Sequence, residues 1–125
     1  MLLGAALIAM PAGAATHRDP DQELQKLLAG RTPEAPVSCI ESSLASSVTV
    51  VRGRAIVYRI GSRLFVNTTE DPSRLRNDDI LVANVRGAQL CNHDAIQLVA
   101  WGGQVPRGFV LLDKFVPYSK ITKAR

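Results

Sequence analysis

Aromatic side chains are scarce in this sequence, which has three Phe, two Tyr and one Trp among 125 residues. Proteins that hold single-stranded nucleic acid usually stack the bases on several aromatic rings, so this scarcity argues against that class. The sequence also has no glycine-rich phosphate-binding loop and no Gly-x-Ser-x-Gly nucleophile elbow. No motif therefore indicates a particular class of enzyme.

Metal-binding side chains are equally few, because the chain has only two Cys and two His. A structural zinc site usually takes four such ligands, and His17 lies close to the apolar start of the chain. The run from Asn77 to Asp79 lacks the spaced acidic residues of a calcium-binding loop. We predict neither a metal site nor a cofactor.

Positive charge is in modest excess, with a formal net charge of +4 at pH 7. The arginines are scattered, and those closest to forming a patch are Arg52, Arg54, Arg59 and Arg63. We interpret these four as solvated residues on strand faces and loops, and we do not expect a nucleic-acid partner. The alternative that stays open is a site for an anionic polymer on these side chains.

An apolar run, Leu2 to Met10, opens the chain and has the character of the hydrophobic part of a secretory leader. Pro11 ends this run, and Ala12-Gly13-Ala14 fits a signal peptidase site, although no Lys or Arg precedes the run. We predict that residues 1–15 are a signal peptide and that the protein is periplasmic or secreted in a bacterium. The run is too short to cross a bilayer, so no membrane span is expected. The alternative is a buried N-terminal helix.

Residues 16–36 are predicted to form a short helix and a linker. Asp19 is placed to cap the helix, Pro20 fits its first position, and Gly30 can end it in a left-handed conformation. Three leucines make a narrow apolar stripe that is expected to dock on a larger surface: Leu24, Leu27 and Leu28. The two prolines between Arg31 and Pro36 indicate an extended linker.

A tight β-hairpin is predicted from Ala55 to Asn67, because two runs of β-branched and aromatic residues flank Gly61-Ser62. Glycine at the first central position supplies the positive φ of a type II′ turn. This loop fixes the register, so that Tyr58 lies opposite Phe65. Both faces of the hairpin are largely apolar, so we expect it to lie at the centre of the fold.

Further short strands are expected before and after the hairpin, with turn residues between them. They are residues 37–40, 48–52, 80–85, 89–91, 95–101 and 109–116, with Pro117 ending the last. Repeated short strands of this kind indicate an all-β fold, a small antiparallel sandwich or barrel. We assign residues 37–119 to this β domain and residues 120–125 to a basic tail. The match of Asn67-Thr68-Thr69 to a glycosylation sequon is interpreted as chance, since the leader is bacterial in type.

The two cysteines, Cys39 and Cys91, are the candidates for a disulfide. An even cysteine count in an exported protein favours a bridge, and two cysteines allow one intramolecular pairing. A disulfide that closes a loop of this size stabilises the folded protein by about 4 kcal/mol.

A competing hypothesis gives Cys91 a chemical role, because His93 and Asp94 follow it closely. A nucleophilic cysteine needs a base and a third group that orients the base, and these residue types fit that need. Neighbours in sequence rarely reach the required geometry, however, and the same residues are common in turns.

Several short motifs from Pro36 onward resemble a family of small exported proteobacterial proteins of unknown function. These are Pro36-Val37-Ser38-Cys39-Ile40, Asn67, Leu90-Cys91-Asn92-His93-Asp94 and Phe115. Two further cysteines of the family pattern are absent here. Their joint absence implies that they form a pair with each other in the family, which leaves Cys39 to pair with Cys91. The resemblance implies no activity.

The sequence therefore predicts an exported, monomeric β protein with a non-enzymatic role, as a small binding or envelope-associated module. One alternative is a Cys/His-dependent enzyme that uses Cys91, His93 and Asp94. The other is the anionic-polymer binder with its four arginines.

Overall fold

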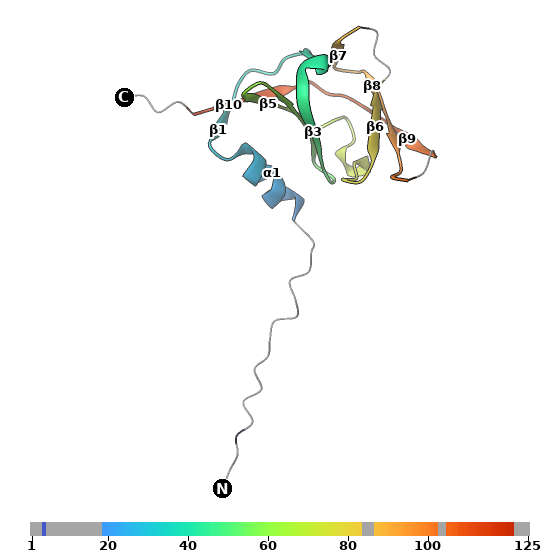
Figure 1. The fold of residues 1–125 in the computed structure, drawn as a ribbon, viewed down its shortest axis with the longest axis horizontal. Coiled ribbons are helices and arrows are strands. Elements are labelled where there is room, and N and C mark those ends of the chain that lie inside the picture. Colours follow the sequence, from blue (N-terminus) through green and yellow to red (C-terminus); the bar gives the residue numbers. More distant parts are fainter. Residues whose placement is uncertain (1–3, 5–18, 84–86, 103–104, 122–125) are drawn as a thin grey trace.

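The computed structural model describes residue 4 and residues 19–83, 87–102 and 105–121 (Figure 1). Apart from Gly4, the predicted leader lies outside these residues. The elements are α1 (Pro20–Leu28), β1 (Arg31–Pro33), β2 (Cys39–Glu41), η1 (Ser42–Leu44), β3 (Ala45–Val51), β4 (Ala55–Ile60), β5 (Arg63–Asn67), η2 (Pro72–Arg74), β6 (Ile80–Ala83), β7 (Gln89–Cys91), β8 (Ala95–Val99), β9 (Pro106–Leu111) and β10 (Val116–Lys120).

The strands form three antiparallel sheets, which confirms the predicted all-β class. The largest sheet has the order β1-β10-β5-β4-β3, and the smaller sheets have the orders β6-β8-β9 and β2-β7. The smaller sheets pack on one face of the large sheet, and α1 packs on its other face. The β part is thus a sandwich with a short helix on its outside (Figure 1).

The β4–β5 hairpin has the predicted register, with Tyr58 opposite Phe65 and Val57 opposite Val66. Gly61 has a φ of 61°, and Ser62 is not among the residues with positive φ, as a type II′ turn requires. Because side chains alternate along a strand, the hairpin supplies apolar groups to both sides of the large sheet. It is therefore the central element of the sandwich.

Two hydrophobic clusters lie on the two sides of the hairpin. The cluster between the sheets contains Ile40, Ile56, Tyr58, Phe65, Leu75, Leu90, Ile96, Leu98, Val110, Leu112 and Phe115. In it, the ring of Tyr58 meets the ring of Phe115 edge to face, with centroids 5.8 Å apart. The cluster under the helix contains Val51, Ala55, Val57, Leu64 and Val66.

Helix α1 begins and docks as predicted. The Asp19 carboxylate accepts a hydrogen bond from the Asp21 backbone N–H, and Pro20 is the first helical residue. The predicted leucine stripe of α1 packs on the cluster under the helix, as Leu24, Leu27 and Leu28. Gly30, with a φ of 74°, turns the chain after the helix.

The segment after α1 differs from the prediction of a linker, because Arg31–Pro33 forms β1 and pairs with β10. The backbone is extended as expected, but the last strand of the domain supplies a partner that local sequence does not reveal. The predicted basic tail also begins too early, since Lys120 still belongs to β10. Residues 122–125 lie outside the described part of the chain.

Pro117 does not end a strand as predicted but lies inside β10, opposite Phe65. Its carbonyl accepts the Glu34 N–H, 2.8 Å away, so its nitrogen faces the same side, where β1 has already ended. The proline therefore removes one ladder hydrogen bond at the margin of the sheet. Smaller differences are that β8 ends at Val99 and that β9 begins at Pro106. Residues 84 and 85, predicted to end a strand, lie outside the described part.

Candidate functional site

A cleft of about 350 Å³ opens between β3 and β6, where the two main layers of the sandwich meet. It is lined by Ser42, Val48, Val50, Tyr58, Asn77, Asp79, Leu81, Ala83, Leu90 and Ile96. Val48 lies opposite Tyr58 in the β3–β4 register, so its side chain is on the face that covers the core. It is nevertheless 49% exposed, because the layer that packs on this face leaves β3 partly uncovered. The cleft is thus an unfilled margin of the core.

Tyr58 is a buried polar residue of the cleft lining, with 5% of its surface exposed. Its ring is held against Phe115, and its hydroxyl makes no hydrogen bond to another described residue. Burial raises the pKa of the phenol well above its usual value, so the hydroxyl stays protonated at physiological pH. The Tyr58 hydroxyl is not among the buried polar atoms that lack a partner, and the cleft that Tyr58 lines is where an acceptor can reach it.

Asp79 is the one carboxylate of the cleft lining, and its charge is compensated. Its side chain is 2% exposed and forms an ion pair with Arg107 on β9, with 2.9 Å between Arg107 Nε and Asp79 Oδ1. Arg107 also donates to the Arg74 carbonyl, 3.3 Å away. The hydrogen bonds that Arg107 donates to the Asp79 carboxylate raise the pKa of Arg107. The pair fixes the start of β6 against β9, and among the described residues of the lining it leaves no uncompensated charge.

The strands that flank the cleft each have one open edge. Among the described strands, β3 pairs with β4 alone, and β6 pairs with β8 alone. Neither strand contains a charged residue or a proline, which are the usual protection of an edge strand. One bulge, between Ala45 and Ser47, interrupts β3 at its start. From Ser47 to Val51, β3 therefore presents regular, unpaired backbone groups beside the cleft.

The predicted disulfide is present between Cys39 and Cys91. The two residues lie opposite each other in the β2–β7 ladder, next to the pair Ile40 and Leu90. Because side chains alternate along a strand, the disulfide lies on the other face of this small sheet from these two core residues. The sulfur of Cys91 is therefore bonded to that of Cys39, and neither cysteine is a free thiol.

The residues after Cys91 form a turn rather than a catalytic group. The Asp94 carboxylate accepts the Cys91 N–H at 2.7 Å, and the Asp94 N–H bonds the Cys91 carbonyl. His93 has a φ of 71° and a side chain that is 75% exposed, with its Nδ1 3.4 Å from a carboxylate oxygen of Glu70. The imidazole therefore pairs with Glu70, and Asp94 serves the backbone of the turn.

The four candidate arginines are divided between the two ends of β4. Arg52 and Arg54 lie in the turn before this strand, and Arg59 and Arg63 lie beside the Gly61 turn after it. A strand of this length separates its ends by roughly 17 Å. The four side chains therefore do not gather into one patch.

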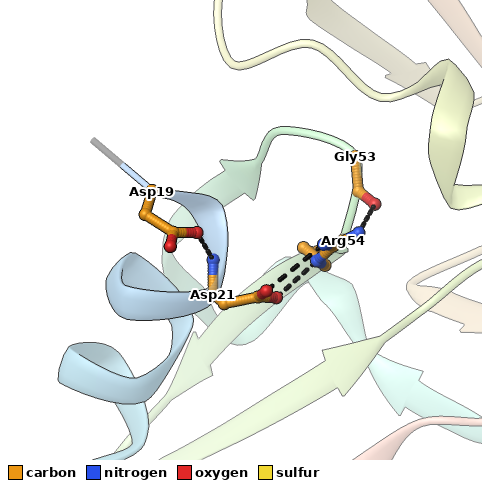
Figure 2. Close-up of polar contacts among 4 residues, drawn as sticks. All are labelled: Asp19, Asp21, Gly53 and Arg54. Atoms are coloured by element: carbon orange, nitrogen blue, oxygen red, sulfur yellow. Dashed lines mark hydrogen bonds and ion pairs between the residues drawn. The ribbon is translucent and has the colours of Figure 1, made fainter. Parts of the chain in front are cut away.

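Two of these arginines are already paired with carboxylates. Arg54 makes a two-point hydrogen bond with Asp21 on α1 and also donates to the Gly53 carbonyl (Figure 2). This contact lowers the pKa of Asp21 and raises that of Arg54. Arg63 pairs with Glu34, while its guanidinium lies 5.1 Å from the centre of the Phe65 ring.

Asn67, the first residue of the sequon-like motif, is fully buried. Its amide nitrogen donates to the Asp113 carbonyl at 2.7 Å, and its oxygen accepts the N–H groups of Thr69 and Asp113. An oligosaccharide has no access to this nitrogen in the folded protein, which agrees with the interpretation of the sequon as chance. Asn67 instead ties the end of β5 to the segment that leads into β10.

No helix in residues 19–83, 87–102 and 105–121 is long and apolar enough to cross a membrane. Over the same residues, no three His, Cys, Asp or Glu side chains are grouped so that they can hold a metal ion.

The fold and the cleft define a class: a disulfide-bonded β sandwich with an open margin between its layers. No family model matches the chain, and comparison with curated proteins and with solved structures found no match. The resemblance to a family of exported proteins therefore stays a prediction.

The cleft was not predicted from the sequence, although most of the strands around it were. Val48, Val50 and Leu81 appear in the sequence as ordinary strand residues, and nothing local shows that β3 and β6 remain unpaired on one side. Both strands lack the charge and proline that usually mark an edge strand, so their sequences pointed to paired positions instead.

Proposed function

We propose that this protein is an exported, non-enzymatic binding module whose ligand occupies the cleft between β3 and β6. The observation that carries the proposal is the composition of that cleft. It combines six apolar side chains with a buried tyrosine whose hydroxyl has no partner in the described residues. Its volume of about 350 Å³ is within the range usual for ligand pockets. The lining complements a ligand with an apolar body and a hydrogen-bond acceptor.

Export to the periplasm or the medium is part of this proposal. It is supported by the leader-like sequence of residues 1–15 and by the disulfide, since structural disulfides persist mainly in oxidising compartments. A bridge between β2 and β7 also suits a module that works outside the cell, where it resists unfolding without chaperones. The proposal includes association of this module with the cell envelope.

The competing enzyme hypothesis loses its nucleophile in this structure, because Cys91 is bonded to Cys39 and His93 faces Glu70. The anionic-polymer hypothesis loses its patch, because the four arginines are divided between the two ends of β4. We therefore develop neither as a second function.

The proposal is tested by nuclear magnetic resonance of the 15N-labelled protein titrated with two small amphipathic probes, hexanamide and decanoate. We expect saturable shifts of backbone amides around the cleft, above all at Val48 and Leu81. Val48→Lys should weaken the binding about tenfold or more. Ser47→Lys, an exposed neighbour on the same strand with its side chain on the opposite face, is the matched control and should bind like the wild type.

Shifts that gather on the outer face of the β6-β8-β9 sheet, for example around the exposed Phe109, would place the site elsewhere. An absence of saturable shifts with either probe would count equally against the proposal.

A further inference from the structure

The open backbone edge of β3 runs along the same cleft that Val48 and Val50 line. An edge strand displays a row of N–H and C=O groups, and its natural complement is the backbone of another extended chain. Because β3 carries no charge and no proline, nothing in its sequence opposes such pairing. A ligand without a backbone, such as an acyl chain, leaves this row of groups unused.

We propose that the ligand of this module is an extended peptide segment of another protein, which adds as a strand to the outer edge of β3. The inference rests on the proposed function and specifies its ligand. The peptide pairs with Ser47–Val51, beyond the bulge at the start of the strand. Alternate side chains of the peptide enter the cleft, because side chains of a strand point to opposite faces in turn.

The lining of the cleft determines which side chains can enter. Val48, Val50 and Leu81 form apolar walls, and the charge of Asp79 is compensated by Arg107. A charged side chain inserted between these walls loses its hydration, and the described lining offers it no uncompensated opposite charge. The peptide should therefore have apolar or β-branched residues at every second position and polar residues between them.

Tyr58 adds a single polar contact on the floor of this site. Its protonated hydroxyl has no partner in the described part of the chain, so it can donate to an oxygen atom that enters the cleft. A serine, threonine or glutamine side chain at one of the inward positions supplies such an oxygen. This contact selects among peptides that already fit the edge.

The test is a displayed library of seven-residue peptides with lysine at both ends, selected on the immobilised protein. We expect the selected sequences to alternate apolar and polar residues. Synthetic peptides of the selected sequence should bind the wild type and Gln97→Lys alike, because Gln97→Lys adds the same charge on the exposed outer face of β8, and they should bind Val48→Lys at least about tenfold more weakly.

A second measurement tests backbone pairing without changing the protein. Methylating the amide nitrogens of every second peptide residue removes the hydrogen bonds on one side of the added strand. One of the two alternate sets of methylated peptides, the set that faces β3, should lose binding about tenfold or more. Equal binding by both methylated sets would show that the backbone is not recognised and would overturn the inference.

The remaining outcomes separate this inference from the proposed function. If hexanamide or decanoate binds at the cleft while the library yields no peptide sensitive to Val48→Lys, the cleft is a small-molecule site and the peptide inference fails alone. If neither peptide nor probe binds, both fail. Concentration-dependent dimers in analytical ultracentrifugation that Val48→Lys abolishes would show that a second copy of this chain uses the edge, and would also overturn the inference.

Discussion

Cys39 and Cys91 lie directly opposite each other in the β2–β7 ladder, with their Cα atoms 4.0 Å apart. The Asn92 N–H bonds the Ser38 carbonyl beside them, so the cysteines occupy a non-hydrogen-bonded position, where side chains approach most closely. Each of these strands has three residues, and an isolated two-stranded sheet of this size is marginal in water. The covalent bond therefore holds together a sheet that its hydrogen bonds alone hold weakly.

Replacing both cysteines by serine is expected to lower the free energy of unfolding by about 4 kcal/mol, because the unfolded chain regains the freedom of a long loop. Urea denaturation of the variant and of the wild type, each monitored by circular dichroism, measures the difference. The wild type unfolded in the presence of dithiothreitol should match the variant. A loss below about 1 kcal/mol would show that the bridge contributes little.

Replacing Asn67 by alanine is expected to lower the free energy of unfolding by about 3 kcal/mol, because it leaves the buried Thr69 N–H and the partly buried backbone groups of Asp113 without their partners. Thr68→Ala removes an exposed neighbouring side chain and is the control, with an effect within about 0.5 kcal/mol. Denaturant titrations of both variants provide the comparison. Equal stability of the two variants would mean that Asn67 does not tie β5 to the later segment.

The docking of α1 is tested by Leu27→Ala, which removes part of the leucine stripe that packs on the cluster under the helix. We expect a loss of about 1–2 kcal/mol, below the usual value for a core leucine because Leu27 is partly exposed. Gln25→Ala, on the exposed side of the same helix, should change the stability by less than about 0.5 kcal/mol. A helix that does not dock would respond equally little to both changes.

The raised pKa of Tyr58 predicts a loss of stability at alkaline pH. An unfolded tyrosine releases its proton near pH 10, about its ordinary pKa, while folded Tyr58 retains it. The unfolded state then binds fewer protons than the folded state, so the free energy of unfolding falls as pH rises above about 10. The contribution of Tyr58 is complete below that pH.

Urea denaturation of the wild type and of Tyr58→Phe at several values between pH 7 and pH 11 measures this effect. The stability of the wild type should decline relative to that of the variant only in the alkaline part of the range. Parallel profiles for the two proteins would contradict burial of the phenol in its protonated form.

Local sequence predicted the elements whose causes are local. The Gly61-Ser62 turn sets the hairpin register, and Asp19 with Pro20 sets the start of α1, so both agree with the structure. The pairing of Arg31–Pro33 with β10 was not predicted, because its partner lies at the other end of the described chain. Pro117 was misjudged for the same reason: whether a proline ends a strand depends on the neighbour that its nitrogen faces.

The features of the candidate site also differ in whether their causes are local in the sequence. The disulfide followed from the cysteine count and from the family resemblance, and the turn function of Asp94 from its residue type. The cleft depends instead on how far the β6-β8-β9 sheet extends over β3, and no local sequence pattern predicts the extent of this cover. The exposure of Val48 on a core-facing position appears only when the layers are assembled.

The central claim is that ligands bind at the cleft between β3 and β6, and amide hydrogen exchange with a selected peptide tests it most directly. Exchange is measured residue by residue, by nuclear magnetic resonance, in the free protein and in the complex. We predict that the peptide slows exchange in Ser47–Val51 and at Leu81, and leaves the amide of Phe109 on β9 unchanged. Protection that is confined to β9, or that is spread evenly over all strands, would contradict the claim.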